Sequence, residues 1–194
     1  MSTPMSTWKR FSITLQRFST GRGVLIAGVI LVLFTALTLP GQTAEAERMA
    51  QGAGVPDTSL WYTPADLTAM AESYGPAGRQ AYLQARWTFD LIFPLVYTAF
   101  LVTAIGWLAR YISGPSDRWQ MANLLPVLGM ALDYLENIAA SIVMARYPAP
   151  SPVAASLAPI FTLLKWVCGG GSSVLLLGFA LAALWRRLHS RSSI

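Results

Sequence analysis

Apolar residues gather in four long runs along the chain, and polar or basic residues bound each run. The runs cover residues 24–39, 82–112, 119–147 and 157–188. A helix needs roughly 20 mainly apolar residues to cross the hydrocarbon core of a bilayer. The first run is the shortest, and Pro40-Gly41 directly after it favours a helix end there. The pattern predicts an all-α fold, an integral membrane four-helix bundle that forms a single domain over residues 1–194.

The connection between the first two runs, residues 41–78, carries the pattern of a short amphipathic helix. Thr63 suits the N-cap, Pro64 the first helical position and Asp66 the capping-box position. Apolar residues then follow at spacings of three and four, which places them on one helix face: Leu67, Met70, Ala71 and Tyr74. Gly75 favours the end of this helix. We therefore expect a short helix that covers the external side of the bundle.

Composition supports a membrane location. The chain is 54% hydrophobic and 12% charged, whereas soluble domains contain about 25% charged residues. The formal net charge is +5, but the basic residues flank the apolar runs and form no patch interleaved with aromatic residues. We therefore expect membrane lipids as partners and no nucleic acid.

The distribution of Lys and Arg predicts the orientation of the chain, because cytoplasmic connections of membrane proteins carry an excess of these residues. One side carries Lys9, Arg10, Arg17, Arg22, Arg110, Arg118, Arg186, Arg187 and Arg191, and the other carries Arg48, Arg79, Arg86 and Arg146. We expect a multi-pass protein of the cell membrane with both termini in the cytoplasm.

A second interpretation of the first run stays open. A basic leader, an apolar stretch and small residues at Ala44 and Ala46 also occur in cleaved secretory signals. The apolar stretch is longer than the core of most such signals, so we expect the chain to retain it as a membrane span.

Few residues suit metal or redox chemistry. Cys168 is the only cysteine, which excludes an internal disulfide and a zinc site built from several thiolates. The only histidine, His189, lies in the basic tail, away from the predicted spans' interior. We expect no cofactor and no metal.

Five polar residues nevertheless fall inside the predicted spans: Asp90, Asp133, Glu136, Asn137 and Lys165. A charged residue near the centre of a membrane helix costs roughly 2.5 to 3.5 kcal/mol on insertion scales. Spacings of three and four place these residues on one face of each helix, so we expect all five to face the bundle interior. Counting residues from the span ends places them in the outer half of the membrane, with Lys165 paired to Glu136.

This convergence predicts a polar cavity. We expect Tyr97, Tyr134 and Trp166 to form walls of this cavity. The leading hypothesis is binding of a lipid-like or other amphipathic small molecule, with Asp133, Glu136 and Lys165 as polar anchors and no catalytic role. Two alternatives stay open: a structural or accessory subunit with a membrane protein partner or as a homo-oligomer, and a pathway for ions or protons.

In its helix count and its buried acidic residues the chain resembles the emopamil-binding and sigma-2 receptor family. The isomerases of that family use histidines within the membrane, and this chain has none there. The resemblance therefore implies binding of a ligand and not isomerisation.

Overall fold

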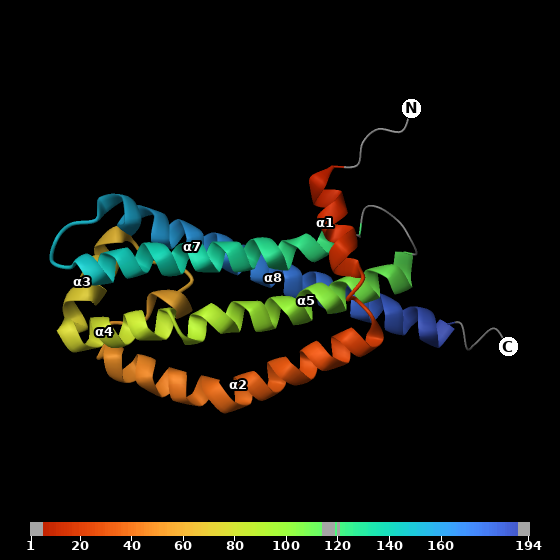
Figure 1. The fold of residues 1–194 in the computed structure, drawn as a ribbon, viewed down its shortest axis with the longest axis horizontal. Helices are drawn as coiled ribbons and strands as arrows, with labels where there is room; N and C mark the ends of the chain where they lie inside the picture. The colour runs from red at the N-terminus through yellow and green to blue at the C-terminus, as the bar shows by residue number, and fades with distance from the viewer. Residues whose placement is uncertain (1–5, 114–118, 120, 190–194) are drawn as a thin grey trace. The chain divides into compact units, whose positions relative to one another are not determined.

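The structure is a computed structural model that describes residues 6–113, 119 and 121–189. Within these residues all regular structure is helical (Figure 1). The elements are, in chain order, α1 (Thr7–Gln16), α2 (Gly21–Ala50), the 3-10 turn η1 (Pro56–Thr58), α3 (Pro64–Ser73), α4 (Gly75–Arg86), α5 (Phe89–Ser113), the 3-10 turn η2 (Met121–Asn123), α7 (Leu124–Arg146) and α8 (Pro152–His189).

Four helical stretches are long and apolar enough to cross a membrane. They are Gly21–Ala50, Gly75–Ser113, Met121–Arg146 and Pro152–His189. This result confirms the predicted fold class, an all-α membrane bundle, and a multi-pass membrane protein.

The first of these helices is longer than the sequence pattern predicts. α2 continues through Pro40 to Ala50, so the expected helix end at Pro40-Gly41 is wrong. Proline removes one backbone donor and disfavours the helix locally. The residues that follow include Ala44, Glu45 and Ala46, which are strong helix formers, and membrane helices tolerate an internal proline.

The second predicted span consists of two helices. α4 ends at Arg86, Trp87 leaves the helical conformation with φ −98° and ψ 9°, and α5 begins at Phe89. This helical stretch starts at Gly75, earlier than the predicted residue 82. The fourth helical stretch likewise starts at Pro152, earlier than the predicted residue 157. In the sequence, this interruption lies between Arg86 and Asp90. The two side chains nevertheless pair in the site described below.

The chain divides into two compact units, which we describe separately. Unit 1 comprises Met1–Leu31, Tyr97–Leu128 and Cys168–Ile194, and unit 2 comprises Val32–Val96 and Gly129–Val167.

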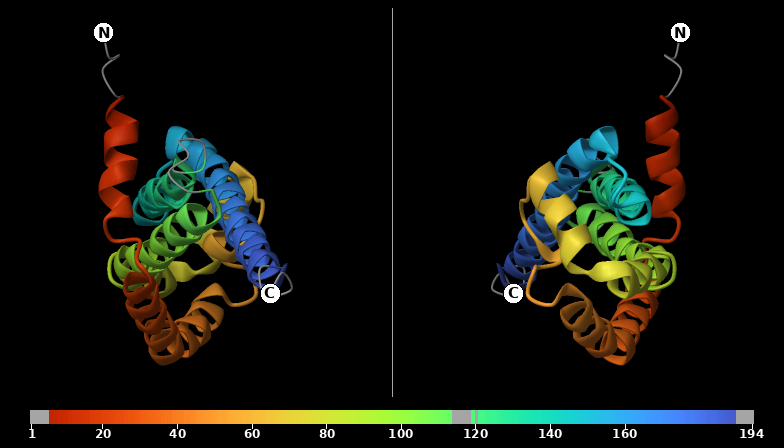
Figure 2. Two further views of the ribbon diagram at one scale, coloured as in Figure 1. Left: turned by 90° about the vertical axis from the view of Figure 1, so that its right-hand side faces the viewer. Right: turned by 90° about the vertical axis from the view of Figure 1, so that its left-hand side faces the viewer.

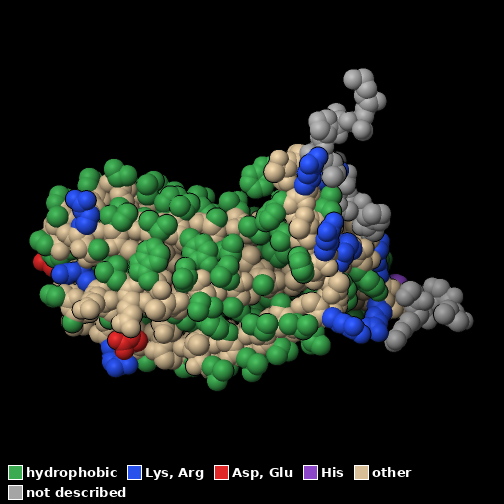
Figure 3. Space-filling model, viewed as in Figure 1, with side chains coloured by type: hydrophobic (Ala, Val, Ile, Leu, Met, Phe, Trp, Pro, Cys, Tyr) green, Lys and Arg blue, Asp and Glu red, His purple; other side chains and the backbone are tan. Residues whose placement is uncertain are grey.

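Unit 1 contains α1, a helix that the apolar pattern did not predict. The buried Ser12 hydroxyl donates to Asn123 Oδ1 at 2.8 Å, and Asn123 Nδ2 donates back to the Ser12 carbonyl at 3.2 Å. An apolar cluster around Ile105, Ala109 and Phe179 forms the core of this unit. Lys and Arg side chains gather over α1 and over the C-terminal end of α8 (Figure 3). The cytoplasmic location of this basic surface stays a prediction.

Unit 2 contains α3, the short amphipathic helix predicted from the sequence. Thr63 caps it, and the capping box with Asp66 is complete. The predicted apolar face is buried against α4, α7 and α8, with Leu67 and Ala71 both 0% exposed. The connection before α3 contacts the first half of α8, because Tyr62 and Ser59 bond to Thr162 and Trp166. Figure 2 shows the helices end-on, with α3 and α8 among them. The helix itself is confirmed, and its external location stays a prediction.

Candidate functional site

Polar side chains from five elements meet inside unit 2. They come from η1, α4, α5, α7 and α8, and we call them the polar cluster: Asp57, Arg86, Asp90, Asp133, Glu136, Asn137 and Lys165. α7 supplies three of them because the spacing in LDYLENIA (residues 132–139) places residues 133, 136 and 137 on one helix face.

Lys165 joins three carboxylates of the polar cluster. Its Nζ lies 3.0 Å from Asp133 Oδ1 and 2.5 Å from Glu136 Oε2, and it also pairs with Asp57. The Glu136 side chain is only 1% exposed and that of Lys165 only 10%. The predicted pair between Lys165 and Glu136 is therefore confirmed. Charged groups inside a membrane protein are expected to pair in this way, because an isolated charge is costly there.

Arg86 is the second cation of the polar cluster. Its Nε lies 2.8 Å from Asp90 Oδ2, and its Nη1 lies 3.2 Å from Asp57 Oδ2. Nη1 also donates to Asn137 Oδ1 at 3.4 Å, and the guanidinium lies over the Tyr82 ring, 4.9 Å from its centroid. Asp57 thus links both cations. Four carboxylates share two cations, so their formal charge exceeds that of the cations.

Asp57 belongs to the connection between α2 and α3 and not to a membrane span. Burial by itself raises the pKa of its carboxyl group, but the positive charges of Arg86 and Lys165 outweigh burial and hold the pKa well below its usual range. Asp57 is therefore ionised at neutral pH, and it ties this connection to α4 and α8.

Tyrosine and tryptophan side chains hold the same connection in place. Tyr62 Oη lies 3.0 Å from Thr162 Oγ1 on α8, and Trp166 Nε1 donates to the Ser59 carbonyl at 3.2 Å. The Tyr74 hydroxyl donates to the Gly54 carbonyl at 2.6 Å. Burial raises the pKa of Tyr62 above its usual range and that of Tyr74 to about 12. Both phenols are thus neutral hydrogen-bonding groups at any physiological pH.

Three carboxylates of the polar cluster also have the spacing of a cation site. One oxygen from each of Asp57, Asp133 and Glu136 lies within 4.8 Å of the others. Oxygen ligands of this kind suit calcium and similar ions. Here, however, the Lys165 ammonium contacts all three carboxylates, so the protein's own cation occupies the position that such an ion requires.

The structure brings most of the predicted site residues together. Asp90, Asp133, Glu136, Asn137 and Lys165 all belong to the polar cluster. Tyr134 donates to the Leu91 carbonyl at 2.9 Å and joins α7 to α5, while Trp166 holds the connection at Ser59. Tyr97 belongs to unit 1, whereas the other predicted residues belong to unit 2. The binding role assigned to these residues stays a prediction.

Asp57 and Arg86 were not among the predicted site residues. The spacing of four between Arg86 and Asp90 is a signal for Arg86, because such residues are neighbours on a helix. Asp57 had no comparable signal, since it lies in an irregular connection among several other acidic residues.

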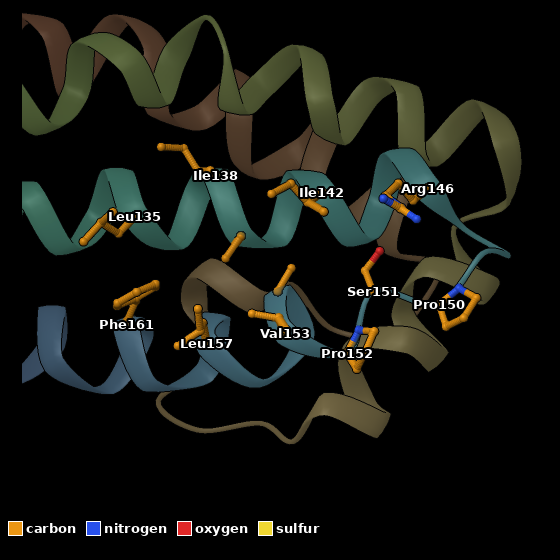
Figure 4. Close-up of a pocket in the computed structure, with 12 residues that line it drawn as sticks. Leu135, Ile138, Ile142, Arg146, Pro150, Ser151, Pro152, Val153, Leu157 and Phe161 are labelled. Carbon is orange, nitrogen blue, oxygen red and sulfur yellow. The ribbon is translucent and has the colours of Figure 1, made fainter.

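Beside the polar cluster, a groove of about 510 Å³ lies between α7 and α8. Its walls are Leu135, Ile138, Ala139, Ile142, Arg146, Pro150, Ser151, Pro152, Val153, Ala154, Leu157 and Phe161. Figure 4 shows Leu135 and Phe161 at one end, with Arg146 and Ser151 at the other. We call this feature the α7–α8 groove. It is apolar along most of its length and polar at one end.

From Asp133 to Arg146, α7 therefore has two different faces. One face carries Asp133, Glu136 and Asn137 into the polar cluster, and the other carries Ile138 and Ile142 into the groove. On α8, Lys165 enters the cluster. The ion pairs thus hold together the same two helices that form the groove walls.

No family model matches the chain, and no curated protein or solved structure matches it. The resemblance to the emopamil-binding and sigma-2 receptor family stays a prediction.

Proposed function

We propose that the protein binds a lipid-like amphipathic molecule in the α7–α8 groove. The groove itself supports this proposal best: its volume lies within the roughly 300–1,000 Å³ of known ligand pockets. All lining residues except Arg146 and Ser151 are apolar. A hydrocarbon chain suits the apolar part, and a polar head group suits the end that carries these two residues.

The polar cluster has a supporting role in this proposal. Lys165 on α8 pairs with Asp133 and Glu136 on α7. These ion pairs fix the separation of the two groove walls. The sequence predicts a second role for the same residues, in which the polar cluster contacts the ligand directly.

One observation favours a second function, that of a structural or accessory membrane subunit. The cations of the polar cluster each contact more than one acidic or amide side chain, and Asp57 ties the connection before α3 to both. Such a network can lock helix packing without any ligand. The two functions differ in whether a purified protein retains a bound molecule.

Native mass spectrometry of the protein, purified in a mild detergent, tests the proposal. Leu157→Trp adds bulk inside the groove, whereas Ile160→Trp adds similar bulk on α8 outside it, and the two side chains are comparably exposed, at 40% and 46%. We expect a stoichiometric lipid-sized adduct on the wild type and on Ile160→Trp, and its loss from Leu157→Trp.

A third variant separates the groove from the polar cluster. If Glu136→Gln loses the adduct while Leu157→Trp keeps it, the ligand is anchored by the cluster and not by the groove. Absence of an adduct from every folded form contradicts ligand binding and favours the structural function.

A further inference from the structure

The polar atoms of the α7–α8 groove are confined to one end, and the side chains there are hydrogen-bond donors. Arg146 is the last residue of α7, and Ser151 directly precedes the first residue of α8. No acidic residue lines the groove. The remaining wall is aliphatic or aromatic, so the two ends of the groove recognise different chemistry.

Arg146 supplies a positive charge to this end. Its side chain is exposed, and no ion pair to it is found among the residues that the structure describes. A guanidinium presents a planar set of donors that fits a carboxylate or a phosphate in two parallel hydrogen bonds. An arginine in the last turn of a helix also stabilises the helix by itself. Arg146 alone therefore does not indicate a ligand.

Ser151, at the start of α8, adds a second polar group to this end of the groove. The Ala155 N–H donates to the Ser151 carbonyl at 2.9 Å, which places Ser151 at the N-cap of α8. The Ser151 hydroxyl is buried, and within the described part of the chain it has no hydrogen-bond partner. It points toward the end of α7 that carries Arg146 (Figure 4). A buried polar group normally has a partner, so the unpartnered Ser151 hydroxyl is an unsatisfied polar group beside this end of the groove.

The backbone of the same turn adds further donors. Pro152 has no N–H, and the N–H groups of the next residues, Val153 and Ala154, have no acceptor within the helix. Both residues line the groove. The first turn of a helix carries partial positive charge and favours an anion. Arg146, the Ser151 hydroxyl and this turn therefore present donors and positive charge to the same end of the groove.

We propose that the head group of the bound amphipath is anionic, the carboxylate or phosphate of a single-chain lipid. This inference rests on the proposed function, because it assigns the chemistry of the molecule in the same groove. Arg146 and Ser151 bind the head group, and the hydrocarbon chain lies along Ile142, Leu157 and Phe161. A lipid is favoured over a free anion because the remaining wall is apolar.

Three probes with the same hydrocarbon chain test the charge of the head group. They are hexadecanoate, its neutral glycerol monoester and the hexadecyltrimethylammonium cation, each titrated against delipidated protein and followed by native mass spectrometry. We expect hexadecanoate to bind about ten-fold more tightly than the neutral ester, the effect of one charge-assisted contact. The cation should bind most weakly.

Variants assign this preference to residues. Arg146→Gln should reduce hexadecanoate to the affinity of the neutral ester and leave the ester unchanged. Arg48→Gln, a matched control on an exposed arginine outside the groove, should change neither. If Arg146→Gln does not fold, Ser151→Ala serves instead and should weaken hexadecanoate more than the ester.

Each other outcome overturns a distinct statement. Equal binding of hexadecanoate and the neutral ester refutes the anionic head group and leaves the proposed function standing. Tightest binding of the cation refutes it as well. Inorganic phosphate that binds as tightly as hexadecanoate refutes the lipid source. If no probe binds the folded wild type, the proposed function itself fails.

Discussion

Replacement of Lys165 by methionine should destabilise the protein strongly. The change keeps an unbranched side chain of similar length, places sulfur at the δ position and removes the ammonium group. That group contacts Asp57, Asp133 and Glu136. Without it, three carboxylates whose oxygens lie within 4.8 Å of one another lose their shared cation. Arg86 then remains as the other cation of the polar cluster, and of the three it pairs with Asp57.

The magnitude follows from the burial of these groups. Removing one partner of a buried ion pair typically costs about 3–5 kcal/mol, because the other charge is left uncompensated. For a chain of this size, 1 kcal/mol corresponds to a change of about 2–4 °C in the midpoint of thermal unfolding. We therefore expect the midpoint of Lys165→Met to fall by roughly 6–20 °C.

Thermal unfolding in detergent micelles, followed by tryptophan fluorescence, measures this effect. Arg48→Gln is the control, since it removes a cation from an exposed pair with Glu45, and such pairs contribute little. The double variant Lys165→Met/Glu136→Gln should recover part of the loss, because the two residues are coupled.

A midpoint for Lys165→Met that matches the Arg48→Gln control refutes this reasoning. So does a double variant whose loss is the sum of the two single losses. Either result means that the ammonium contacts seen in the structure do not stabilise the fold.

The remaining predictions concern other parts of the chain. Because the pKa of Asp57 is lowered in the folded state, its contribution to stability is present above about pH 4 and is lost as the pH falls further. Below that pH, the midpoint of thermal unfolding should therefore depend less on pH in Asp57→Asn than in the wild type. Thr63→Ala removes a helix cap and should lower the free energy of unfolding by about 1 kcal/mol, measured by denaturant titration. A Cβ at Gly106 would lie 2.9 Å from Ser19 Cβ, so Gly106→Ala should lower the unfolding midpoint, whereas Gly41→Ala, with no atom within 4 Å, should leave it unchanged or raise it.

Most of the polar cluster could be predicted from the sequence for a physical reason. Charged residues in a membrane span must face the interior and pair, which limits their arrangement. The helical period then places Asp133, Glu136 and Asn137 on one face, and counting along α8 places Lys165 at a matching depth. The fold class follows equally from the length and composition of the apolar runs.

Asp57 could not be predicted because the path of its connection depends on turn geometry. Gln51, Gly52 and Gly54 have positive φ angles of 47°, 87° and 80°. These turns direct the chain back toward α4 and α8, and no periodic pattern encodes them. Glycine adopts such angles without strain, so its presence permits this path but does not specify it.

The groove was also beyond sequence reasoning. Its residues on α7 and α8 have the same apolar character as the exposed residues elsewhere on the long helices. Whether two apolar helix faces close against each other or leave a space depends on side-chain shape and on the ion pairs behind them. Nothing in the sequence placed Arg146 at the end of a groove, and that position comes from the structure.

Photo-crosslinking tests the central claim, a lipid-like molecule bound in the α7–α8 groove, most directly. A hexadecanoate analogue with a diazirine on its chain is added to the protein in membranes, and the labelled positions are mapped by peptide mass spectrometry. We predict saturable labelling at groove residues such as Ile142, Leu157 and Phe161, and its loss in Leu157→Trp. Labelling that spreads evenly over exposed residues such as Leu33, Leu91 and Val174, without saturation, would contradict a specific site and identify the molecule as ordinary surrounding lipid.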